Sequence, residues 1–207
     1  MKMTRRGFLN ISTAAAVVCA AALLPVEKAA AAQQTMAAQE LLEQAYLYAF
    51  PLVLMDATRK VSTNAETPND TRAPINQFIH AKKLADAAFR TVVTPNVDTI
   101  YTQAFLDVGA EPMLYGVPQT DRFFNVQVLD AWTNTVAVLE APGLYAITRS
   151  NWQGKLPEGV QRINVPTNMV WTIARIVLSG QEDLPNVRAI QDKMQLMPLS
   201  AYQMDSW

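Results

Sequence analysis

The chain has 207 residues and a mass of 22.9 kDa, with 50% hydrophobic and 17% charged residues. This is enough chain for one domain with a sizeable core, or for two small ones. A formal net charge of -1 and a pI near 5.8 exclude the basic surface of a non-specific nucleic-acid binder. One cysteine and one histidine exclude a disulfide framework, a thiolate-built zinc site and a histidine-rich metal site.

Residues 1–32 carry the pattern of a twin-arginine export signal. Arg5 and Arg6 precede an uncharged stretch whose most apolar part runs from Ile11 to Leu24. That part is shorter than the roughly 20 residues a membrane-spanning helix needs. The alanines at 29–32 offer a signal peptidase small residues, which favours cleavage after Ala31 or Ala32. We therefore expect a periplasmic or secreted protein with no stable membrane anchor, a retained anchor being the alternative.

Residues 33–90 are predicted to form an N-terminal helical segment. Apolar residues at spacings of three and four predict a helix over 36–60, which Pro51 should kink or split. A loop rich in Thr, Pro, Asn and Asp should follow over 64–76. Residues 75–89 are predicted to form a short helix.

From residue 91 to 207 the chain is predicted to form a β-sandwich domain with a C-terminal helix. Short runs rich in Val, Ile, Thr and aromatic residues recur about every ten residues, separated by Pro, Gly, Asn or Asp. This spacing favours an antiparallel sandwich or barrel, so the fold class is mainly β with flanking helices (α+β). The final helix is predicted over 183–196, with Pro185 in its first turn. The predicted strands are 100–106, 113–117, 123–129, 135–139, 144–148, 160–165 and 169–178.

Three sequence blocks are distinctive: TPNVDTIY at Thr94–Tyr101, DRFFNVQVLDAWTN at Asp121–Asn134 and PTNMVWTIAR at Pro166–Arg175. In this order they resemble the bacterial domain-of-unknown-function family 1254. The similarity runs from about Tyr46 to Pro198. It implies export and a β-sandwich of jelly-roll type, and it implies no agreed activity.

The resemblance also implies a partner domain. Members of the family usually continue into a second β-rich domain, of domain-of-unknown-function family 1214, whereas this chain stops at Trp207. The resemblance therefore implies either a lone N-terminal module or a truncated reading frame whose partner half is encoded separately or lost. Apolar residues near the C-terminus would then be left exposed, and a homodimer or an aggregate should form.

Polar and aromatic residues within the three blocks are the candidate ligand-binding residues. Amide, carboxylate and phenol groups can orient a hydroxyl-rich ligand, and a tryptophan can stack against a sugar ring. The alternative is that these residues only shape turns by bonding to neighbouring backbone amides. The candidates are Asn96, Asp98, Tyr101, Asp130, Trp132, Asn134, Asn168, Trp171 and Arg175.

Arg175 needs a partner if it lies in a strand among apolar neighbours, because an unpaired charge is costly inside a core. Asp98 or Asp130 is the expected carboxylate, as a structural ion pair; a substrate-binding arginine is the alternative. Arg122 is expected at the surface.

The chain contains few residues that could form a catalytic site. A serine hydrolase would have to use His80, yet no Gly-x-Ser-x-Gly motif is present. A glycosidase pair could draw on Asp98, Asp107, Asp130 or Glu140. A calcium site of Asn96, Asp98, Asp130 and Asn134 lacks the usual loop signature. No catalytic residue, metal or cofactor is therefore assigned.

Three functions remain open. The leading hypothesis is an exported module that binds a small polar or carbohydrate ligand, or a partner β-domain, without chemistry of its own. The second is a hydrolase whose active site needs a missing C-terminal domain. The third is a structural subunit that completes the fold of that domain.

Overall fold

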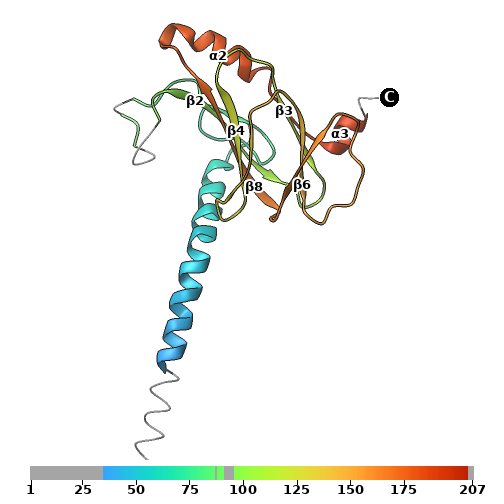
Figure 1. Cartoon of the computed structure of the whole chain (residues 1–207). Coiled ribbons are helices and arrows are strands. Elements are labelled where there is room, and N and C mark those ends of the chain that lie inside the picture. The colour runs from blue at the N-terminus through green and yellow to red at the C-terminus, as the bar shows by residue number, and fades with distance from the viewer. Residues whose placement is uncertain (1–34, 87, 91–95, 205–207) are drawn as a thin grey trace, which may run out of the picture. The chain divides into compact units, whose positions relative to one another are not determined.

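The computed structural model describes residues 35–86, 88–90 and 96–204 (Figure 1). The predicted signal peptide therefore lies outside the described residues. The chain divides into two compact units between Phe50 and Pro51.

A single helix covers residues 35–62 and crosses the boundary between the two units. The chain stays helical through Pro51, so the split predicted as one alternative at this residue does not occur. Polar pairs one turn apart stabilise it, among them Arg59 with Asp56 and Lys60 with Asp56, both at 2.7 Å. No helix in the described part of the chain is long and apolar enough to cross a membrane.

Large apolar side chains of this helix are exposed on several of its sides, which differs from the single buried stripe of an ordinary surface helix. The exposed residues are Met36, Leu41, Leu42, Tyr46, Leu47, Tyr48, Phe50, Val53, Leu54 and Val61.

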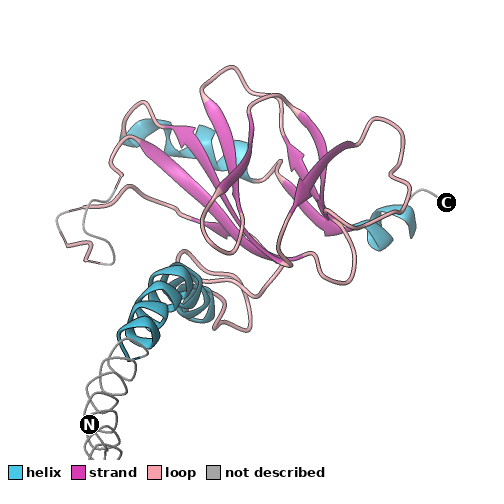
Figure 2. Cartoon of the chain, turned by 60° about the horizontal axis from the view of Figure 1, so that its bottom comes forward, coloured by secondary structure: helices cyan, strands magenta, loops and turns pink. Residues whose placement is uncertain are grey.

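The strands form two sheets (Figure 2). The first has the order β1-β2-β8-β4-β5, and the second has the order β7-β6-β3-β9. The strands of the first sheet are β1 (Ile79–His80), β2 (Thr99–Asp107), β4 (Phe124–Leu129), β5 (Thr135–Leu139) and β8 (Met169–Val177). Those of the second are β3 (Met113–Val117), β6 (Gly143–Arg149), β7 (Gln161–Val165) and β9 (Gln195–Pro198). The predicted α+β sandwich is confirmed, with seven of its strands close to their predicted bounds.

One strand pair departs from the antiparallel prediction. β6 and β7 run parallel, whereas the other paired strands run antiparallel. The turns and the loop of residues 150–160 carry the chain back so that β7 starts beside Tyr145. The sheet is therefore mixed, which the spacing of strands in the sequence could not reveal.

The helix predicted over residues 75–89 is wrong. Asn76 has a left-handed backbone (φ 63), which interrupts any helix at that point. Its backbone N–H donates to the Phe105 carbonyl at 2.8 Å, and its side chain accepts from the Asp107 N–H at 2.8 Å. The segment is instead held along β2, where β1 pairs as a short edge strand.

The predicted C-terminal helix is too long. A 3-10 turn, η1 (Gln181–Asp183), leads into α2 (Leu184–Gln191), which has Pro185 in its first turn as predicted. The chain then forms β9 and the short helix α3 (Leu199–Met204). Figure 1 shows α2 at one end of the sandwich and α3 beside β3 and β6.

The core lies between the two sheets because alternate residues of each strand point inward. Ile100, Leu106, Val126 and Ile176 of the first sheet belong to the same buried cluster as Tyr115, Ile147 and Val165 of the second. The remaining alternate residues of β2, β8 and β4 lie on the opposite side, which we call the outer face.

The C-terminal apolar residues pack against the sandwich rather than lying bare. Leu199 is buried beside Leu114 and Ala146, with Met197 and Tyr202 packed against them. Leu196, Met197 and Tyr202 stay half-exposed, so the dimerisation expected from this end of the chain stays a prediction; Trp207 lies outside the described part of the chain.

Candidate functional site

Six side chains on the outer face of β2, β8 and β4 form the candidate site, which we call the outer-face cluster. They comprise two aromatic rings, three carboxamides and one guanidinium, and all are half-buried. Directly opposed residues of neighbouring strands share a face, so the register places them in rows. The cluster is Tyr101, Gln103, Asn125, Gln127, Trp171 and Arg175.

Arg175 lies at the centre of one row. It pairs with Tyr101 of β2 on one side and with Asn125 of β4 on the other. Its guanidinium carbon is 5.5 Å from the centroid of the Tyr101 ring, a cation–π distance. Its Nη2 donates to Gln127 Oε1 at 3.0 Å, and Gln127 Nε2 in turn donates to Thr135 Oγ1 at 2.7 Å. The guanidinium is therefore held from two sides.

Trp171 lies in a second row, four residues before Arg175 on β8. Its indole N–H donates to Gln103 Oε1 at 3.2 Å. Its ring stacks on Phe105, with centroids 5.5 Å apart and an interplanar angle of 2°. Because the nitrogen and one ring face are both engaged, the indole has a fixed orientation.

Several polar groups of the cluster have no partner among the described residues. Asn125 Oδ1 is buried without a hydrogen bond. The Nε and Nη1 groups of Arg175 make no hydrogen bond and are not buried. A buried acceptor without a donor is costly, whereas the open N–H groups of Arg175 are accessible to a ligand.

Three residues of this cluster were candidates from sequence, namely Tyr101, Trp171 and Arg175. Gln103, Asn125 and Gln127 were missed. The alternation of polar and apolar residues in β2 and β4 placed the three carboxamides on one face of their strands. The register that sets them beside Arg175 depends on pairing over 48 residues or more, which no local pattern contains.

The predicted ion pair of Arg175 is wrong. Asp98 is exposed and lies at the entrance of β2, and Asp130 lies beyond the end of β4. No carboxylate in the described part of the chain lies within 4 Å of Arg175. Carboxamide and aromatic partners replace the expected carboxylate.

Asn96 and Asp98 shape the entrance to β2. Asn96 Oδ1 accepts from the backbone N–H groups of Asp98 and Thr99 at 2.9 and 2.8 Å. The Thr99 hydroxyl also donates to it at 3.1 Å. This is the turn-forming alternative stated for these residues.

Asp130 and Asn134 are engaged in the turn between β4 and β5. Asp130 is 4% exposed, and its Oδ1 accepts from the backbone N–H groups of Trp132 and Asn134, both at 2.9 Å. Its Oδ2 accepts from Asn134 Nδ2 at 2.9 Å. The turn also contains Thr133 at φ 66. These bonds use the carboxylate oxygens that a calcium ion would need.

Asn168 lies apart from the cluster, in the exposed turn between β7 and β8. Its Oδ1 accepts a hydrogen bond from Arg149 Nη1, and its carbonyl accepts from the Val108 N–H at 2.9 Å. It joins the two sheets at this end.

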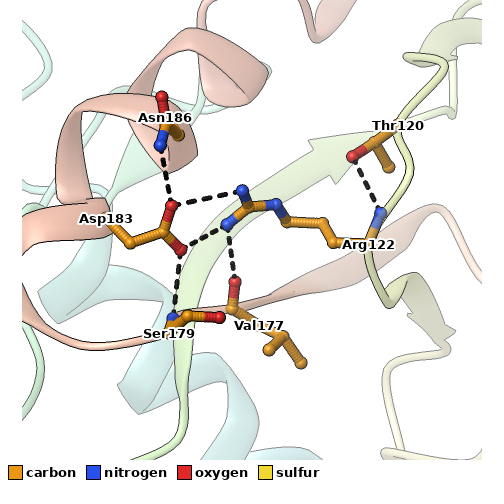
Figure 3. Close-up of polar contacts among 6 residues, drawn as sticks. All are labelled: Thr120, Arg122, Val177, Ser179, Asp183 and Asn186. Carbon is orange, nitrogen blue, oxygen red and sulfur yellow. Dashed lines mark hydrogen bonds and ion pairs between the residues drawn. The ribbon is translucent and has the colours of Figure 1, made fainter.

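Arg122 is not a free surface residue, contrary to expectation. Its guanidinium binds both carboxylate oxygens of Asp183, at 2.5 and 3.2 Å, and the Val177 carbonyl at 3.2 Å (Figure 3). The Ser179 N–H and Asn186 Nδ2 also donate to Asp183, at 3.0 and 2.9 Å. With side chains 22% and 12% exposed, this pair ties the start of β4 to the turn before α2.

His80 lies in β1 rather than in a helical turn. Its Nδ1 is 2.9 Å from the hydroxyl oxygen of Thr102, and that oxygen accepts a hydrogen bond from Gln191 Nε2 at 3.1 Å. Burial lowers the pKa of His80, which favours a neutral ring. Thr102 is fully buried, so the arrangement supports the packing of α2 on β1 and β2.

Acidic, histidine and cysteine side chains do not assemble into a metal site within the described residues, where no group of three or more is found.

Comparisons with known proteins agree with this architecture. The family model of the proteins of unknown function DUF1254 matches residues 75–198. Among curated proteins, none matches the chain. The crystal structure of the VPA0106 protein from Vibrio parahaemolyticus is similar, with a TM-score of 0.63 at 24% identity over 77% of this chain. The chain spans 38% of the length of that protein.

Proposed function

The chain belongs to the DUF1254 family, and we propose that this member is a ligand-binding module that holds a small polar or carbohydrate ligand on its outer-face cluster. The observation that supports this most directly is the fixed, half-buried Trp171 and Arg175 on one strand, with carboxamides on both sides. Aromatic faces and carboxamides are groups that bind the apolar faces and hydroxyls of sugars.

The arrangement favours binding over catalysis. Two pinned side chains present a ring face and hydrogen-bond donors, and pre-organised groups lower the entropic cost of binding. The cluster itself contains no nucleophile activated by a base and no pair of carboxylates.

We expect a soluble oligosaccharide that fits the cluster to raise the melting temperature of the protein. At about 100 times its Kd, a ligand that binds only the folded state adds about 2.7 kcal/mol. For a chain of this size this corresponds to a rise of roughly 5 to 10 °C. Thermal melts against neutral and acidic oligosaccharides measure it.

Trp171→Ala should abolish that rise, because it removes the ring that the ligand contacts. Trp152→Ala is the matched control, since Trp152 packs against Leu114 and Ala146 of the other sheet. Equal shifts in the two variants, or no shift with any saccharide in the unmodified protein, would contradict the proposed site.

The exposed apolar side chains of the helix between Met36 and Phe50 favour a second candidate function, the docking of a partner protein domain. Contiguous exposed apolar surface is typical of protein interfaces. We propose as the partner a β-rich domain of family 1214, which the resemblance of the three sequence blocks implies. In that case the helix, rather than the outer-face cluster, would carry the contact.

We propose that the protein acts outside the cytoplasm, because its first residues fit a twin-arginine signal. Changing Arg5 and Arg6 together to lysine should retain the precursor in the cytoplasm, since the paired arginines are the recognised element. Cell fractionation measures this. Undiminished periplasmic protein in the double variant would exclude twin-arginine export.

A further inference from the structure

Arg175 is a cation that the described protein does not neutralise. It is half-buried on the central strand β8, next to Ile173 and Val177 on the same face. Its partners are a neutral carboxamide and an aromatic ring, whereas Arg122 has a carboxylate. A guanidinium removed in part from water gains most from an anionic partner.

The free part of the guanidinium has the geometry for such a partner. Gln127 takes one of the two hydrogens of Nη2, which leaves the other Nη2 hydrogen open together with Nε and Nη1. The planar fork of an arginine binds a carboxylate through its N–H groups, which a point charge cannot reproduce. Tyr101 supports one face of the guanidinium, so its orientation is set before any ligand arrives.

The neighbouring groups suit the hydroxyls of a sugar rather than a bare acid. The Tyr101 hydroxyl makes no hydrogen bond to a described residue and is not buried, so it can bond to a hydroxyl of a ligand. Trp171 lies about 13 Å from Arg175 along β8, at about 3.3 Å per residue. A ligand that contacts both residues is therefore extended.

We propose that the ligand of the outer-face cluster is an acidic oligosaccharide, built from uronic-acid units, whose carboxylate binds Arg175. The inference rests on the proposed function and adds the ligand class. Trp171 binds the face of one sugar ring, and Arg175 binds the carboxylate of another.

The test compares acids with their methyl esters, which keep the sugar and remove the charge. The probes are trimers of galacturonate, mannuronate and glucuronate, each as the free acid and as the full methyl ester. Calorimetric titration of the protein purified after expression of the full chain gives each Kd. We expect at least one acid to bind about tenfold or more tightly than its ester, and more weakly as salt is raised.

Arg175→Gln should bring the affinity for the acid down to that for the ester, and Arg175→Lys should recover only part of the loss. The matched control is Arg162→Gln, because Arg162 also stacks on an aromatic ring, Trp152, at 4.9 Å, but on the other sheet. It should bind the acid as the unmodified protein does.

The possible results separate the two proposals. An ester that binds as tightly as its acid would overturn the acidic ligand and leave the saccharide site standing. Binding of neutral oligosaccharides alone would also overturn the acidic ligand and leave the saccharide site standing. Failure of every saccharide, neutral or acidic, would overturn both. The acid and ester comparison on the unmodified protein decides the matter even if Arg175→Gln does not fold.

Discussion

Asp130→Ala is expected to lower the free energy of unfolding by about 2 to 4 kcal/mol. The change removes a buried carboxylate that accepts three hydrogen bonds, from the N–H groups of Trp132 and Asn134 and from the Asn134 amide. Hydrogen bonds to charged groups contribute about 1.5 to 3 kcal/mol each, and donors left without a partner add a further cost. Water that enters the space left by the removed carboxylate offsets part of this loss of free energy. Denaturant unfolding monitored by tryptophan fluorescence measures the loss.

Asp98→Ala is the matched control for that change. It makes the same chemical substitution at a turn before a strand, but the Asp98 side chain is exposed and accepts no hydrogen bond from a described residue. Its effect should stay within about 0.5 kcal/mol. Asn134→Ala should fall between the two, because it removes one bond and keeps the other two. Equal effects of Asp130→Ala and Asp98→Ala would show that the turn does not depend on its carboxylate.

Strands were predictable where apolar and polar residues alternate, or where β-branched residues are frequent. In β4, Val126 and Val128 point to the core while Asn125 and Gln127 point outward, and the sequence pattern alone indicates this. β9 was missed because Gln195–Pro198 contains no β-branched residue and follows a helical pattern. It is a strand because β3 offers it a free edge, so tertiary pairing overrides local preference.

The partners of the charged side chains could not be predicted either, because they too depend on tertiary pairing. Arg175 and Arg122 both lie in or beside strands with apolar neighbours, and local sequence led to the opposite of the observed pairing: a carboxylate for Arg175 and none for Arg122. The fold brings Asp183, 61 residues away, to Arg122, and brings only carboxamides and rings to Arg175. The candidate site therefore followed from the register of β2, β8 and β4, with residue chemistry supplying only half of its members.

Replacing Asp183 with Asn is expected to remove most of the acid sensitivity of this end of the sandwich. The Arg122 guanidinium, with help from the Ser179 N–H and Asn186, holds the pKa of the Asp183 carboxyl well below its usual range. In the unfolded chain the same carboxyl titrates near pH 3.9. A lowered pKa in the folded state means that the carboxylate stabilises the fold above about pH 4, and that this contribution is lost as the pH falls further.

Denaturant midpoints between pH 2 and pH 6 give the comparison. The unmodified protein should lose stability steeply below pH 4, and Asp183→Asn should start lower at pH 6 and fall less in acid. Asp98→Asn is the control, because it removes a carboxylate that has no partner in the described part of the chain, and it should follow the unmodified protein. Arg122→Met should lower stability at pH 6 as Asp183→Asn does, and the double variant should lose less than the sum because the two residues act as one pair. Parallel pH curves for Asp183→Asn and the unmodified protein would mean that the pair does not govern the attachment of α2 to the sheet.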